Sequence, residues 1–225
     1  MPPVWYNVRW RIKMQYTIDK NLIRIADGKT EYYGADQEWL RTGWERLSGC
    51  GPTTAALMMM YMAAAFPACC AALYPYALPA CRDEFAAYMQ EVREYVKPGM
   101  MGLTDPKEFA RDALEFAETR GGGFIAQQIR SQFSAGVAFG FFKQALRHGY
   151  LPALLILRNP SPELKDFTWH WMAVTGCDDE TRTLTVSSYG QKFEIAFDRA
   201  WIQKKPYYAA GVYFYPTQMP EVEHK

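Results

Sequence analysis

A twelve-residue apolar run at positions 55–66 constrains the fold of this 225-residue chain more than any other feature. The run has no polar face, so a helix formed here must be covered by protein on every side. Pro52 lies just before it, and proline suits the first turn of a helix, where its missing N–H costs nothing. We therefore expect a buried helix that begins at or just before Cys50. The run is too short to cross a bilayer, which takes about 20 residues.

Cys50 has the surroundings of a reactive thiol. The dipole and free N–H groups of a helix N-terminus favour a thiolate and lower a thiol pKa from about 8.5 toward neutrality. Gly49 and Gly51 flank the cysteine, leave its sulfur uncrowded and let another backbone segment approach closely. A cysteine that only fills space in a core needs neither glycine. This context predicts that Cys50 is a nucleophile.

Composition limits the class of protein. Hydrophobic residues make up 49% of the chain and aromatic residues 16%, which suffices for one large core or two lobes around a cleft. The 25 basic and 24 acidic residues give a net charge of +1, so no overall field favours nucleic acid or an anionic membrane. The first residues lack the basic-then-apolar pattern of a leader. We expect a protein without a membrane span and a cytoplasmic location, and the oligomeric state stays open.

The five cysteines favour free thiols over a disulfide framework, because their number is odd and their spacing irregular. They are Cys50, Cys69, Cys70, Cys81 and Cys177. Three of them lie close together in sequence, but they lack a nearby histidine and a repeated CxxC motif, so we expect no zinc site. The chain also lacks phosphate-binding and dinucleotide-binding fingerprints. The expected site therefore holds no metal and no cofactor.

Helical patterns come first along the chain and strand patterns second. An alternating strand is predicted at 4–18 and helices at 50–66, 83–96 and 104–119, after which three glycines occupy 121–123. A further helix at 137–147 is followed by predicted strands at 150–157, 168–176, 183–188, 192–197 and 211–215. This order is typical of an α+β fold. We expect a single domain over 1–225, with a helical lobe in about 1–123 and a mainly β lobe in about 124–225.

His170 lies near the start of one of these strands. A hairpin with its turn within residues 178–180 places Ser187 or Ser188 opposite His170, depending on the centre of the turn, and either hydroxyl can orient the imidazole. We expect Trp169 and Trp171 to pack in the core on the opposite strand face, or one of them to form a cleft wall. The other two histidines are His148, explained as a helix C-cap, and His224 in the C-terminal tail.

Three segments resemble papain-like cysteine peptidases, nearest the branch of bacteriocin-processing double-glycine peptidases. Residues 50–56, CGPTTAA, resemble the nucleophile signature, and residues 170–178, HWMAVTGCD, resemble the histidine strand of that branch. Residues 187–190, SSYG, are similar to the asparagine-containing segment of papain-like enzymes. The resemblance implies a papain-like fold, in which a helical lobe with the cysteine packs on an antiparallel sheet lobe with the histidine.

The resemblance also implies roles for four residues. Cys50 is the nucleophile and His170 the base, while Ser187 stands where the family has asparagine or aspartate. Gln37 is the candidate oxyanion donor, although it lies further upstream of the cysteine than in the family, and an ordinary surface glutamine is the alternative. The implied activity is that of a cysteine peptidase or amidase that forms a thioester with a peptide or protein substrate.

Two other functions stay open at this point. The same Cys50 and His170 pair would also serve an acyltransferase or a transglutaminase-like enzyme. A papain-like domain without activity, used for binding, is favoured by the serine in the third catalytic position.

Overall fold

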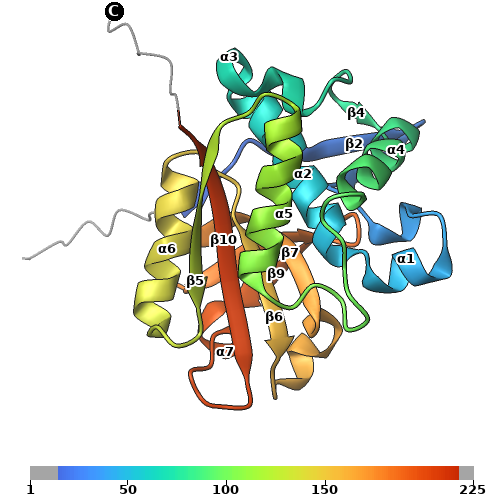
Figure 1. The fold of residues 1–225 in the computed structure, drawn as a ribbon. Coiled ribbons are helices and arrows are strands. Elements are labelled where there is room, and N and C mark those ends of the chain that lie inside the picture. Colours follow the sequence, from blue (N-terminus) through green and yellow to red (C-terminus); the bar gives the residue numbers. More distant parts are fainter. Residues whose placement is uncertain (1–14, 218–225) are drawn as a thin grey trace, which may run out of the picture.

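The computed structural model describes residues 15–217, which form an α+β fold with a helical part and an antiparallel sheet (Figure 1). The helices are α1 (Gly43–Ser48), α2 (Cys50–Ala65), α3 (Pro67–Cys70), α4 (Arg82–Arg93), α5 (Pro106–Thr119), α6 (Ala135–Arg147) and α7 (Phe197–Ala200). Short 3-10 helices are η1 (Lys20–Ile23), η2 (Gln37–Trp39), η3 (Ala71–Leu73) and η4 (Pro162–Phe167). The class predicted from the order of helices and strands is confirmed.

The main sheet contains seven of the described strands and is antiparallel throughout. They are β1 (Gln15–Thr17), β5 (Phe124–Arg130), β6 (Ala153–Arg158), β7 (His170–Asp178), β8 (Thr183–Ser188), β9 (Gln191–Ala196) and β10 (Tyr208–Pro216). Their order is β5-β10-β6-β7-β8-β9, and β1 pairs with the far end of β7. A small second sheet joins β2 (Arg24–Asp27), β3 (Thr30–Tyr33) and β4 (Ala80–Cys81).

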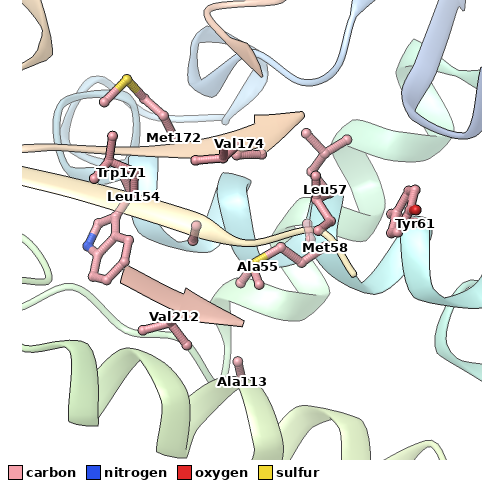
Figure 2. Packing of buried hydrophobic residues seen from close by; sticks show 14 of the residues in the cluster. Ala55, Leu57, Met58, Tyr61, Ala113, Leu154, Trp171, Met172, Val174 and Val212 are labelled. Carbon is pink, nitrogen blue, oxygen red and sulfur yellow. The ribbon is translucent and has the colours of Figure 1, made fainter. Parts of the chain in front are cut away.

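Helix α2 is the buried centre of the helical part, as the apolar run predicts. Residues 50–63 of the helix are all buried. It packs on β7 and on α4, and Figure 2 shows its Leu57 and Met58 in one apolar cluster with Val174 of β7. Full burial of one such large apolar side chain stabilises the fold by about 1.5–3 kcal/mol. The helix is therefore fixed along its length, and so is the position of its first residue, Cys50.

Two amphipathic helices cover opposite faces of the sheet (Figure 1). Phe109 of α5 stacks on Trp171 of β7 and lies near Phe214 of β10, with ring centroids 4.2 and 6.4 Å away. Phe141 of α6 instead contacts Tyr213, the neighbour of Phe214 in β10. Since neighbouring side chains of a strand point to opposite faces, α5 and α6 enclose β10 between them.

The sequence-based boundaries agree with the structure for most elements and fail for some. The predicted helices correspond to α2, α4, α5 and α6, and the five predicted strands to β6 through β10. Strand β5 was not predicted, because its sequence FIAQQIR groups its apolar and polar residues instead of alternating them. The small second sheet was also missed. Most of the strand predicted at 4–18 lies outside the described residues, and its last part is β1.

Within residues 15–217, no helix is long and apolar enough to cross a membrane. The same part of the chain contains no group of three or more His, Cys, Asp or Glu side chains arranged to hold a metal ion. The five cysteines are free thiols and form no disulfide bond. The sulfurs of Cys69 and Cys70 lie 3.2 Å apart, at the distance of a hydrogen bond.

Candidate active site

Cys50 is the first residue of α2, where two glycines let the surrounding chain pack closely. Gly49 joins α1 to α2 with helical angles, φ −83° and ψ −5°. A Cβ at Gly49 would overlap Leu40 and lie 2.6 Å from the carbonyl oxygen of Glu45. A Cβ at Gly51 would lie 3.1 Å from Leu103. Both glycines are therefore in close contact with their surroundings, but the neighbours are mainly side chains and the carbonyl of the adjacent helix α1, not another backbone segment as expected.

His170 begins β7 and is held by two contacts. Its Nε2 lies 2.6 Å from the hydroxyl oxygen of Ser188. Its ring stacks on Tyr189, with centroids 4.7 Å apart and planes 14° from parallel. The serine occupies Nε2 and the tyrosine fixes the ring plane. Nδ1 is therefore the ring nitrogen that neither contact occupies.

One small cavity is lined by all four residues expected in the site. Cys50 reaches it from α2, His170 from β7, Gln37 from η2 and Ser187 from β8. The space open to the centre of a water molecule is about 10 Å³, which is enough for roughly one water. The exposed fraction is 8% for Cys50 and 6% for His170. The cavity is therefore narrow in this structure, and a substrate larger than a water must widen it.

Burial dominates the ionisation of the thiol. The Cys50 sulfur lies 3.8 Å from the carbonyl oxygen of Trp169. Burial raises the pKa of Cys50, although the backbone N–H groups of Trp171, Gly51 and Cys50 itself favour the thiolate. The expectation of a lowered pKa is wrong for this structure, because the loss of water around the buried sulfur outweighs the N–H groups that favour the thiolate.

Burial also lowers the pKa of His170, to about 4. The imidazole is therefore uncharged at neutral pH. An uncharged imidazole is the form that can accept a proton, so His170 rests in the state required of a general base.

Ser188, not Ser187, contacts the imidazole. The Ser187 hydroxyl donates instead to the carbonyl oxygen of Tyr33, at 2.7 Å. The expected hairpin register is wrong because the turn between β7 and β8 occupies residues 179–182, so Ser187 pairs with Ala173 and not with His170. The residue that orients the imidazole is therefore Ser188, the second of the two serines considered from the sequence.

Gln37 reaches the cavity because its segment is tied to the turn after β8. The N–H of Tyr33 donates to the carbonyl oxygen of Gly190, and the N–H of Gly190 donates to that of Ala35. The Gln37 side chain then donates from Nε2 to the carbonyl oxygen of Arg46, at 2.7 Å. A primary amide has two N–H donors, so one remains after this bond.

Two buried oxygens on this cavity have no hydrogen-bond partner among the described residues. They are Oε1 of Gln37 and Oγ1 of Thr53, and both residues line the cavity. Leaving such an atom unpaired costs about 1–3 kcal/mol, and proteins satisfy most of them. Polar atoms without partners, in a space for about one water, are what a site that binds a polar ligand or water provides.

Tyr189 was not expected in the site, and of the two alternatives for Trp169 only the second agrees with the structure. Tyr189, which stacks on His170, has a left-handed backbone with φ 51°. Trp171 is buried as expected, and its Nε1 donates to the carbonyl oxygen of Leu103 at 2.7 Å. Trp169 is 43% exposed and has φ 56°, so only its alternative role as a wall is compatible with the structure. The sequence signal for a wall of the site was Trp169, the aromatic residue directly before His170.

No protein-family model and no curated protein matches this chain. Its function must therefore be argued from the residues of the site.

Proposed function

We propose that this chain is a cysteine-dependent amide hydrolase of papain-like type, a peptidase or an amidase. The observation that carries the proposal is the meeting of Cys50, His170 and Gln37, from three separate segments, around one narrow cavity. They supply a nucleophile, a base and an amide donor, the three groups needed for acyl transfer. The general α+β class is compatible with the papain-like resemblance of residues 50–56 and 170–178.

In the proposed reaction, Cys50 attacks the substrate carbonyl while His170 takes the thiol proton through Nδ1. The new C–S bond gives a tetrahedral intermediate with the negative charge on oxygen. Its collapse breaks the C–N bond, and His170 passes the proton to the leaving amine. Water then attacks the thioester with His170 as base, which releases a carboxylic acid and restores the thiol. Because the Cys50 thiol and the His170 imidazole are both neutral in the resting protein, the thiolate and imidazolium pair forms only when substrate is bound.

The backbone N–H of Cys50 and the remaining N–H of Gln37 are the proposed donors to the oxyanion. The bond from Gln37 to Arg46 fixes the amide before substrate arrives. Such pre-organised donors act strongly in a dry cavity, and losing one typically costs about 3 kcal/mol of transition-state stabilisation.

Ser188 is the proposed positioning residue for His170. Its hydroxyl lies 2.6 Å from Nε2 and keeps Nδ1 available to the thiol. A hydroxyl is neutral, so it stabilises an imidazolium less than a carboxylate does. We therefore expect slower turnover than a carboxylate partner would give.

The proposal is tested by trapping the acyl-enzyme. p-Nitrophenyl acetate should transfer one acetyl group to Cys50, detected by intact-protein mass and located by peptide mapping. Cys50→Ser should remove this thioester, whereas the matched change at an exposed thiol, Cys81→Ser, should not. Product formed in ¹⁸O-labelled water should carry the label if water is the acceptor, whereas capture by an added amine identifies an acyltransferase. The proposal would be overturned if the extent of acetyl labelling were the same in Cys50→Ser and in His170→Ala as in the wild type.

A binding domain without activity is the second candidate, and a specific observation favours it. The raised pKa of Cys50 and the burial of its side chain both disfavour a free thiolate in the resting protein. In that case, Cys50 should stay unacylated in the folded protein and react only after unfolding. The same mass measurement, made with and without urea, distinguishes the two candidates.

A further inference from the structure

Cys50 also borders a second cavity, on the outer side of the thiol. This open groove has a volume of about 300 Å³, and Ser48, Cys50 and Gly102 form part of its lining. The rest of the lining consists of large apolar side chains: Trp44, Leu47, Met100, Met101 and Trp169. All five are exposed, with 91% of Met100 and 76% of Leu47 accessible to solvent. Single exposed apolar residues are ordinary, but a group of five around one groove marks a binding site.

The same segments that build the narrow cavity hold the walls of this groove. The N–H of Gly102 donates to the carbonyl oxygen of Gly99, and Gly102 has φ 74°, so residues 99–102 form a tight turn that carries both methionines. Leu103, directly after the turn, accepts the bond from Trp171 in β7. The carbonyl oxygen of Trp169, which also lines the groove, lies 3.8 Å from the Cys50 sulfur. A ligand in the groove therefore lies next to the nucleophile.

The chemistry of the lining favours an aliphatic occupant over a peptide. None of the described lining residues is charged. The Ser48 hydroxyl is used on the carbonyl oxygen of Trp44, at 2.9 Å, and the N–H of Gly102 is used within its turn. The N–H and C=O groups of a peptide would find few partners here, at a cost for each one left unpaired. A hydrocarbon chain needs no partner, and methionines adapt to its shape.

We propose that the groove binds the aliphatic acyl chain of an uncharged N-acyl amide or acyl ester, with its carbonyl carbon at the Cys50 sulfur. The cleavage step rests on the function proposed above, whereas binding in the groove does not. In that step, a C–S bond forms and the C–N or C–O bond breaks, while the thiol proton passes through His170 to the leaving amine or alcohol. Water then releases the fatty acid and returns a proton to the thiol.

A series of p-nitrophenyl esters tests how chain length affects acylation. The rate constant for Cys50 acylation is measured from acetate to octanoate below micelle-forming concentrations, and normalised to the rate with a free thiol. Each methylene that is fully buried should raise it about fourfold. Leu47→Lys and Met101→Lys should lower the octanoate rate at least tenfold and leave the acetate rate unchanged. Val137→Lys, at an exposed apolar residue of α6 outside the groove, is the control.

Binding is measured separately on the Cys50→Ala variant. Octanamide should bind in titration calorimetry, and adding Leu47→Lys should weaken it at least tenfold. If acetate labels Cys50 but chain length has no effect and octanamide does not bind, the groove proposal is overturned and the proposed function stands. If no ester labels Cys50 while octanamide binds as described, the proposed function fails and the groove proposal stands. If N-acetyl-leucyl-leucinamide bound tenfold more tightly than octanamide, the groove would be a peptide site and the groove proposal would be overturned.

Discussion

The two sides of Cys50 differ in almost every physical respect. On the inner side, the cavity with His170 and Gln37 has room for about one water, and hydrogen bonds hold the side chains of His170 and Gln37. On the outer side, a larger groove of about 300 Å³ is lined by exposed apolar side chains. The contrast separates two tasks: rigid polar groups suit proton transfer, and adaptable apolar ones suit recognition. Inner-side variants should change the rate constant of acylation, and outer-side variants should change only the preference for the acyl chain.

The largest effect is expected from His170→Gln. The variant keeps a side chain that can bond to Ser188 but lacks a basic nitrogen, so Cys50 acylation should fall by about 10³-fold, within the range for general-base catalysis. Acetate and octanoate esters should lose the same factor in burst-phase kinetics. His148→Gln is the control, because His148 is exposed and its Nδ1 bonds to the carbonyl oxygen of Gln144 in its own helix, away from the cavity. If His170→Gln slowed acylation only with long-chain esters, the inner and outer sides of Cys50 would have to be treated as one site.

Gln37→Ala should give the next largest effect, about a 10²-fold fall in the acylation rate constant. The cause is the loss of one oxyanion donor, which acts equally on short and long acyl chains. Gln90→Ala provides the control, because Gln90 is a partly buried glutamine that bonds to Glu45, away from the cavity. If the acylation rate constants of Gln37→Ala and the wild type were equal, Gln37 would have no part in the proposed mechanism. Its role would then be structural, through its bond to Arg46.

The inner side was largely predictable because its signals are local. Cys50 is marked by its glycines and by the apolar run behind it, and His170 by the strand it begins. The partner of His170 was not predictable to the residue, because the register depends on the length of the turn between Asp178 and Thr183. A single extra residue exchanges which serine faces the imidazole.

The outer side could not be predicted, because no local pattern connects its parts. Trp44 and Leu47 come from α1, Met100 and Met101 from a loop, and Trp169 from the residue before β7. Each alone looks like a core residue or an unremarkable surface residue. Trp169 was expected mainly in the core, but its left-handed backbone turns it away from the alternation of the strand. Only the assembled chain brings the five side chains to one thiol.

A pH titration of stability separates the two sides without any substrate. The pKa of His170 is about 4 in the folded chain and about 6.5 when unfolded. The unfolded state therefore binds the proton first, so stability is present above pH 6.5 and is lost as the pH falls to 4. The loss attributable to His170 should be about 3 kcal/mol in the free energy of unfolding, measured by urea titration. His170→Gln should lack this component, whereas Leu47→Lys should retain it. Identical pH profiles for wild type and His170→Gln would mean that the imidazole is solvated.

The adjacent serines provide the smallest and most discriminating test. Ser188→Ala removes the partner of Nε2, and the loss of one hydrogen bond, worth about 1 kcal/mol, should slow acylation about fivefold. Ser187→Ala removes the bond to Tyr33, so it should lower the free energy of unfolding by about 1 kcal/mol and leave acylation within about twofold of wild type. The ¹⁵N spectrum of His170 should change its tautomer signals only in Ser188→Ala. This readout assigns orientation of the imidazole to one hydroxyl and support of the Tyr33 segment to the other, although the two residues are neighbours in β8. If Ser187→Ala alone slowed acylation, the third catalytic position would return to Ser187, and the geometry of the inner cavity would have to differ from the one described.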